Sequence, residues 1–168
     1  MIRIIGIGSP FGDDAAGLIA ARQLAAAPPS DTEVVEADRP GTTLIQLLDG
    51  ADAVILIDAA HSGAPPGTVH DLDLRALPQP TIGLVSSHDL GVIEAVQLAI
   101  TLGRCSLRGR VLAIETQPPD ESLIPPRGSI GGLSATTRAA VERAVDRARQ
   151  WANRFRREAT ACVSVAVP

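Results

Sequence analysis

Hydrophobic and polar positions follow two periods along the chain, one typical of strands and the other typical of helices. Short runs rich in Val and Ile predict buried strands, and longer Ala- and Leu-rich segments with helical spacing predict amphipathic helices. The predicted strands cover residues 2–7, 32–38, 52–60, 69–74 and 110–116. The predicted helices cover residues 14–27, 42–49, 88–103 and 134–157.

Strands and helices alternate through most of this pattern, which predicts parallel strands joined by crossover helices. The expected fold class is therefore α/β, as a three-layer α/β/α sandwich. The most apolar strand, 52–60, is expected at the centre of the sheet, and the alternating segment 69–74 is expected at an edge. We expect a single domain over residues 1–157, followed by a tail, 158–168, without assigned structure.

Composition narrows the possible functions. The chain has 168 residues, of which 45% are hydrophobic and 2% aromatic, so the core is expected to be aliphatic, and aromatic platforms for nucleic-acid bases are excluded. The net charge is −4 and the chain has no lysine, which excludes a P-loop lysine and Schiff-base chemistry. No segment resembles a signal peptide or a membrane span, so a cytoplasmic protein is expected, with no nucleic-acid or membrane partner.

The two cysteines do not indicate a site. Cys105 and Cys162 lie far apart and form no CxxC motif, so we expect neither a disulfide scaffold nor a structural zinc site. Both are expected to act as small buried hydrophobic side chains.

Candidate chemistry lies where predicted strands end, because ligands of open α/β sheets bind beyond the carboxyl ends of the strands. A glycine-rich turn after the first strand is followed by Asp13 and Asp14 at a helix start. A dinucleotide-binding turn does not fit, because Phe11 replaces the third glycine and two carboxylates would repel a pyrophosphate. The two acids either cap the helix or hold a cation, and either could be the site residue.

Two further candidates follow later strands. Asp58 ends the most buried strand and either caps the next loop or belongs to a site. His88 begins a predicted helix that Ser86 or Ser87 can cap, and the helix dipole there disfavours the charged imidazole. His88 is either a capping or surface residue or a metal ligand. His61 is expected to support Asp58 from a nearby loop, whereas His70 is expected to be solvated.

Together, Asp14, Asp58 and His88 form a set of two carboxylates and one imidazole on one edge of the predicted sheet. Such a set suits a divalent ion such as Ni²⁺ or Zn²⁺ and leaves coordination positions open. The sequence shows no Ser–His–Asp or Cys–His arrangement, so covalent catalysis is disfavoured.

Four motifs in this order resemble those of the nickel–iron hydrogenase maturation endopeptidases. They are GIG followed by DDAAG (6–17), ILIDAA (55–60), SSHDLG (86–91) and IETQPPDESLIPPRGSIGGLS (114–134). The resemblance implies a phosphorylase/hydrolase-like fold with a mostly parallel five-stranded sheet. It also implies that Asp14, Asp58 and His88 are the catalytic and metal-contacting residues.

The same resemblance implies an activity and a partner. It implies an endopeptidase that removes the carboxy-terminal peptide of a hydrogenase large-subunit precursor after nickel insertion, with the nickel in the precursor as the recognition signal. Other divalent ions such as zinc or cadmium are expected to fit the same site. Two alternatives remain open: a nickel-sensing chaperone that docks on the precursor without cutting it, and a nucleotide-dependent enzyme. The apolar segment 122–126 and the edge near 68–74 are candidate docking surfaces.

Overall fold

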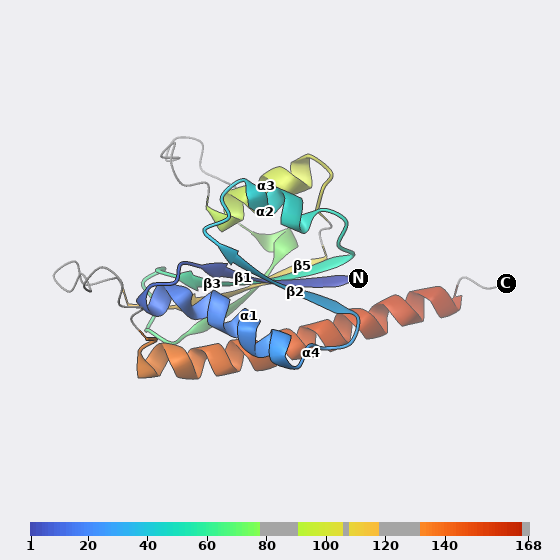
Figure 1. The fold of residues 1–168 in the computed structure, drawn as a ribbon. Helices are drawn as coiled ribbons and strands as arrows, with labels where there is room; N and C mark the ends of the chain where they lie inside the picture. The colour runs from blue at the N-terminus through green and yellow to red at the C-terminus, as the bar shows by residue number, and fades with distance from the viewer. Residues whose placement is uncertain (78–90, 106–107, 118–131, 166–168) are drawn as a thin grey trace.

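In the computed structural model, the chain forms a five-stranded sheet with helices on both faces (Figure 1). The structure describes residues 1–77, 91–105, 108–117 and 132–165. The strands are β1 (Ile2–Gly8), β2 (Thr32–Asp38), β3 (Ala53–Ala60), β4 (Val69–Asp73) and β5 (Gly109–Glu115). The helices are η1 (Gly12–Ala15), α1 (Ala16–Ala26), α2 (Thr43–Leu48), η2 (Leu74–Ala76), α3 (Val92–Thr101) and α4 (Ala135–Val165).

The strand order is β2-β1-β3-β5-β4, and every neighbouring pair is parallel except β4 with β5. The predicted α/β/α class and the mostly parallel sheet are thereby confirmed. Strand β3 lies at the centre, and Val54, Ile55, Leu56 and Ile57 are fully buried. Strand β4 lies at an edge as predicted, and its antiparallel direction follows from a short connection after β3 rather than a crossover helix.

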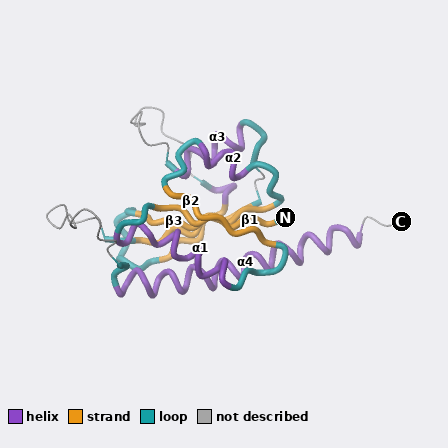
Figure 2. The backbone as a smooth tube through the Cα atoms, viewed as in Figure 1, coloured by secondary structure: helices purple, strands orange, loops and turns teal. Residues whose placement is uncertain are grey.

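Two hydrophobic clusters lie on opposite faces of the sheet. On one face, α1 and α4 pack against alternate positions of β1 and β3, such as Ile4 and Ile55. On the other face, α2 and α3 pack against the intervening positions, such as Ile5 and Leu56. Figure 2 shows the resulting three layers, with the sheet between the two helical layers. The alternation of side chains across each strand produces this division.

Helix α4 differs most from the prediction. It continues to Val165, eight residues beyond the predicted end at 157, and in Figure 1 it runs past the sheet. Among the side chains described, which end at Ala161, the last buried one is Phe155, and Arg157 to Ala161 are exposed. The helix continues past the predicted end because the segment up to Val165 contains no glycine or proline that would stop the backbone hydrogen bonding.

Smaller differences concern the ends of other elements. The first acidic turn is a separate 3-10 helix, η1, and α1 begins only at Ala16. Helix α3 begins at Val92 with Gly91 in the N-cap position, and Gly103 ends it with a positive φ of 68°. The proposed caps Ser86 and Ser87 lie outside the described residues.

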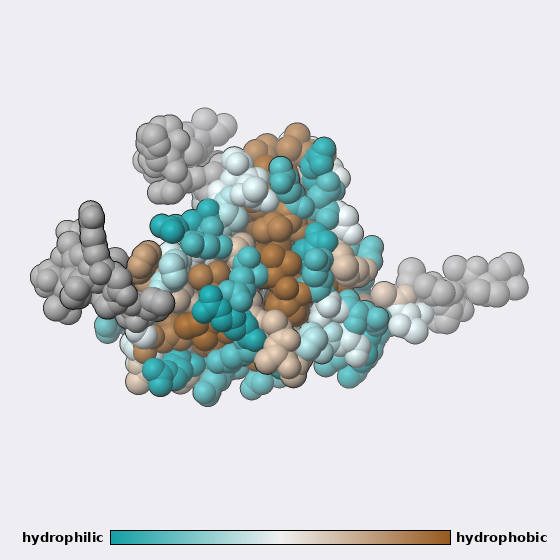
Figure 3. All heavy atoms as spheres, in the orientation of Figure 1, coloured by the Kyte–Doolittle hydropathy of each residue, from teal (hydrophilic) through white to brown (hydrophobic). Residues whose placement is uncertain are grey.

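Some apolar side chains remain on the surface. Leu98 and Leu102 on α3 are 40% and 57% exposed. Figure 3 shows hydrophobic residues, in brown, at the surface of the molecule. Phe11, beside η1, is 51% exposed. Among the described residues, every helix is too short or too polar to span a lipid bilayer.

Candidate active site

The carboxyl ends of β1 and β3 lie side by side. The strands are parallel neighbours, and Gly6 on β1 pairs with Ile57 on β3. Asp58 therefore emerges next to the end of β1, where the chain turns into η1 and its residue Asp14. Two of the three predicted site residues thus come to the same edge of the sheet, as the alternation of strands and helices implies.

Glycines let the first helix approach this edge unusually closely. A Cβ atom on Gly17 would lie 2.1 Å from the carbonyl oxygen of Ile7 and 2.3 Å from that of Ile57. A Cβ atom on Gly8, whose φ is +155°, would lie 2.0 Å from the carbonyl oxygen of Asp14. No side chain fits in either place, so the glycines fix η1 directly above the ends of β1 and β3.

Asp58 has the environment expected of a functional carboxyl group. Burial, with a smaller contribution from the negative charge of Asp14, raises its pKa from 3.8 to about 6. The backbone N–H of Ala59, 2.9 Å from Oδ1, and the nearby His61 oppose this rise without cancelling it. A half-buried acid that is influenced by a second acid can hold a proton or a cation near neutral pH.

Hydrogen bonds distinguish the two adjacent acids of η1. Asp13 accepts hydrogen bonds from the backbone N–H of Ser134 (2.6 Å) and from its hydroxyl group (2.8 Å). The Ser134 oxygen in turn accepts from the backbone N–H of Thr137 at 3.2 Å, as an N-cap of α4 does. Asp13 therefore anchors the start of α4, whereas Asp14 is exposed at the edge. Of the two candidates, this arrangement favours Asp14 as the site residue.

His61 is attached to the end of β5. Its Nε2 lies 2.9 Å from the hydroxyl oxygen of Thr116, which is itself 3% exposed. The backbone N–H of Thr116 donates to the carbonyl oxygen of Ala60 at 3.0 Å. This agrees with the expectation that His61 supports Asp58 from a nearby loop, because its charge also acts on the Asp58 carboxyl group.

Sequence inspection missed the role of Glu115. Its side chain is 2% exposed, and its carboxylate accepts from Ser62 N (2.7 Å), Gly63 N (2.9 Å) and the Ser62 hydroxyl (2.8 Å). Burial tends to raise the pKa of Glu115, but these hydrogen bonds and the one with His70 outweigh it and lower the pKa. Glu115 thus ties the loop after β3 to the end of β5. The available signal was an acid at the end of an apolar strand.

His70 is solvated in part, as expected, but it also makes contacts that the sequence did not indicate. Its Nε2 lies 3.3 Å from the Glu115 carboxylate and 3.4 Å from the Ser62 hydroxyl, and its side chain is 30% exposed. Both partners meet at the same ring nitrogen, so the group cannot relay a proton from a serine to an acid. Cys105 has no activated thiol, because burial raises its pKa to about 11.

His88 lies outside the described residues, as does segment 122–126. Among the residues that the structure does describe, no group of three His, Cys, Asp or Glu side chains is arranged to hold a metal ion. The set of Asp14, Asp58 and His88 therefore stays a prediction, with Asp14 and Asp58 placed at one edge.

The protein thus has an α/β fold, and two acidic residues, Asp14 and Asp58, lie at the edge where the neighbouring strands β1 and β3 end. The model of the hydrogenase maturation protease family matches residues 19–151, which is most of the chain. The chain therefore belongs to the hydrogenase maturation protease family. The matched range includes Asp58 and the position of His88 and begins after Asp14.

Solved structures of hydrogenase maturation proteases share this fold. One is the hydrogenase maturating endopeptidase HybD from E. coli, with a TM-score of 0.65 and 23% identity over 88% of each chain. Another is the [NiFe] hydrogenase maturation protease HycI from Thermococcus kodakarensis KOD1, with a TM-score of 0.59 and 22% identity over 89% of this chain and 90% of the other. No curated protein matches the chain significantly.

Proposed function

We propose that this protein is a cytoplasmic endopeptidase that removes the carboxy-terminal peptide of a [NiFe] hydrogenase large-subunit precursor after nickel insertion. Membership in the hydrogenase maturation protease family supports a peptidase acting on such a precursor. The observation that carries the proposal is the half-buried Asp58, whose pKa is raised to about 6 by burial and by the neighbouring Asp14. Two neighbouring carboxylates suit a divalent ion brought in by the substrate.

In this proposal, nickel is part of the substrate. Asp14 and Asp58 contact it from the ends of β1 and β3, and His88 supplies the imidazole. Holding the precursor at its nickel places the scissile segment beside the edge of the sheet, and fixed geometry of this kind can contribute ~7–11 kcal/mol to lowering a barrier. With its raised pKa, Asp58 can also take a proton from an attacking water near neutral pH.

The test is processing of a purified, nickel-loaded precursor, followed by mass spectrometry of its carboxy terminus. Asp58→Asn and His88→Ala are expected to fold normally and to slow processing at least ~100-fold, because each removes one contact to the nickel or one proton acceptor. Glu36→Gln, at an exposed ion pair with Arg22 (2.8 Å), is the matched control and is expected to process normally.

Two results would contradict the proposal. Full processing by both Asp58→Asn and His88→Ala would remove these residues from the mechanism. Binding of the precursor by the wild-type protein without any loss of mass would instead favour the nickel-sensing chaperone.

A further inference from the structure

Positive charge is concentrated on one helix of this acidic chain. Helix α4 carries seven arginines and three acidic residues, whereas the rest of the chain carries eight arginines and sixteen acidic residues. Two cavities lie between α4 and the β4–β5 edge of the sheet, with volumes of about 350 and 450 Å³. Their lining includes six arginines, which define what we call the arginine groove: Arg75, Arg108, Arg110, Arg143, Arg147 and Arg154.

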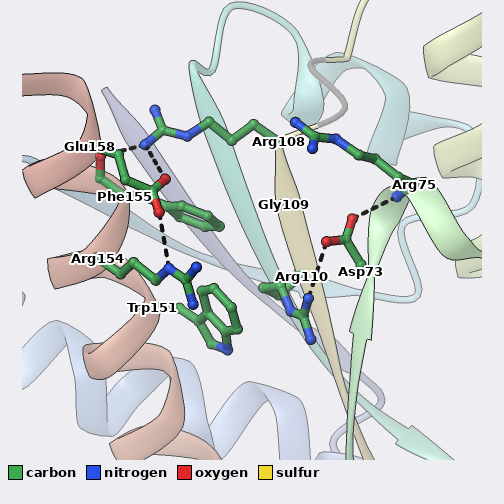
Figure 4. Close-up of a pocket in the computed structure, with 9 residues that line it drawn as sticks. All are labelled: Asp73, Arg75, Arg108, Gly109, Arg110, Trp151, Arg154, Phe155 and Glu158. Atoms are coloured by element: carbon green, nitrogen blue, oxygen red, sulfur yellow. Dashed lines mark hydrogen bonds and ion pairs between the residues drawn. The ribbon is translucent and has the colours of Figure 1, made fainter. Parts of the chain in front are cut away.

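The centre of the groove is balanced in charge. Arg110 binds the carboxylates of Asp71 (2.7 Å) and Asp73 (3.2 Å) and so bridges the two cavities. Arg108 and Arg154 share Glu158 at 3.0 and 2.9 Å (Figure 4). The acids of the groove are thus occupied by its inner arginines.

The outer arginines keep an excess of positive charge. Arg143 donates to the carbonyl oxygen of Gly67 at 2.7 Å, and none of the ion pairs between described residues involves it. Arg147 lies 3.7 Å from Asp71, a carboxylate already bound by Arg110. These exposed guanidinium groups can bind carboxylates in a bidentate manner without breaking an existing strong pair.

One end of the groove lies at the carboxyl edge of the sheet. This end contains Gly67, whose backbone N–H donates to the carbonyl oxygen of Glu115, the last residue of β5, at 2.7 Å. Its other end is Gly109, at the start of β5. A segment lying in the groove would therefore have one end beside the edge that carries Asp58.

The aromatic residues of the groove argue against a nucleic acid. The ring of Trp151 lies between the guanidinium groups of Arg110 (4.3 Å) and Arg154 (4.9 Å), and Phe155 is 5% exposed. The rings are already covered, so they offer no free face on which a base could stack.

We propose that the arginine groove binds an acidic segment of the protein substrate and so orients that substrate at the carboxyl edge of the sheet. The proposal rests on the proposed function, since the substrate is the hydrogenase precursor. Docking through exposed charges affects association and its salt dependence more than the chemical step. A change in the groove should therefore alter KM and leave kcat nearly constant.

The test compares R143E/R147E with R149E/R156E in processing of the nickel-loaded precursor. The control pair changes the same net charge on the same helix, and Arg149, like Arg143, donates to one carbonyl oxygen (Ala27, 2.6 Å). R143E/R147E is expected to raise KM about tenfold with kcat within about twofold, and the control to stay within about twofold for both. If R143E/R147E fails to fold, the milder R143Q/R147Q is tested in its place and is expected to raise KM about threefold.

Binding separates this proposal from the proposed function. If the wild-type protein does not cut the precursor, the proposed function fails, but the dissociation constant of the precursor must still rise about tenfold in R143E/R147E. An unchanged KM and dissociation constant in that variant would overturn the groove as a docking site. Tight binding of a single-stranded DNA oligonucleotide that displaces the precursor from the groove would overturn the choice of a protein segment.

Discussion

The carboxyl edge of the sheet and the arginine groove are adjacent regions with opposite charge. At the edge, two acids lie close enough that burial and mutual repulsion raise the pKa of Asp58 to about 6. In the groove, arginines outnumber acids, and Arg147 shares Asp71 with Arg110. In the described part of the chain, each region therefore carries an excess of charge of one sign.

The difference between them concerns rigidity. The edge depends on backbone packed against backbone, since Gly17 allows no side chain beside Ile7 and Ile57. The groove depends on long side chains layered on Trp151. A site that must place a metal ion needs fixed geometry, whereas a docking surface tolerates adaptable side chains. The comparison therefore predicts that the edge responds to changes of shape and the groove to changes of charge.

The largest expected effect is at Gly17. Replacing a helical glycine by alanine ordinarily stabilises a helix by about 1 kcal/mol. Here the new methyl group would meet two backbone carbonyl oxygens at 2.1 and 2.3 Å, so Gly17→Ala is expected to lower the free energy of unfolding by about 3 kcal/mol or more. Urea denaturation measures this loss, and Gly132→Ala, where no atom lies within 4 Å, serves as control. A Gly17→Ala protein as stable as wild type would show that the edge is not rigid.

The next effect is at Trp151, on the groove side. The ring packs between two guanidinium groups, and its Nε1–H donates to Asp71 at 2.9 Å. Trp151→Ala is expected to cost about 2–3 kcal/mol of stability, because it removes this packing and a hydrogen bond that holds α4 to β4. Thermal unfolding measures this loss of stability, and Gln150→Ala, at an exposed neighbouring position, is the control. A loss no larger than that of the control would mean that the stacked side chains do not hold α4 in place.

The smallest effect is a gain in stability at Asp58. Its pKa rises from 3.8 to about 6 on folding, so the folded protein is penalised once the pH exceeds 6, by at most about 3 kcal/mol and by less because solvent screens the half-buried carboxyl group. Below about pH 4 the group is protonated in both states and the penalty disappears. Asp58→Asn should therefore unfold at a higher temperature than wild type at pH 8 and at the same temperature at pH 3.5.

Asp146→Asn, at an exposed position of α4, is the control and should not change the midpoint at either pH. A destabilised Asp58→Asn protein at pH 8 would contradict the interpretation that Asp58 is held at a cost in free energy.

Much of the fold could be predicted from the sequence. The strand of residues 52–60 and its central place followed from an unbroken apolar run, and the edge position of Val69–Asp73 followed from alternation. Asp14 and Asp58 could be assigned to one edge because parallel strands end together. Glu115 could not be assigned to Ser62 and His70, since 53 and 45 residues separate them along the chain.

The sequence by itself determined the layers, the central place of residues 52–60 and the acids at the strand ends, because hydrophobic periodicity and chain connectivity are local properties. Only the tertiary structure decided that Asp13 anchors α4 while Asp14 stays exposed. It also decided that six arginines, from β5, the residue before it, η2 and α4, line a common groove. Such contacts form between groups that are distant in the sequence. Packing in three dimensions selects their partners, and the hydrophobic pattern along the sequence does not indicate them.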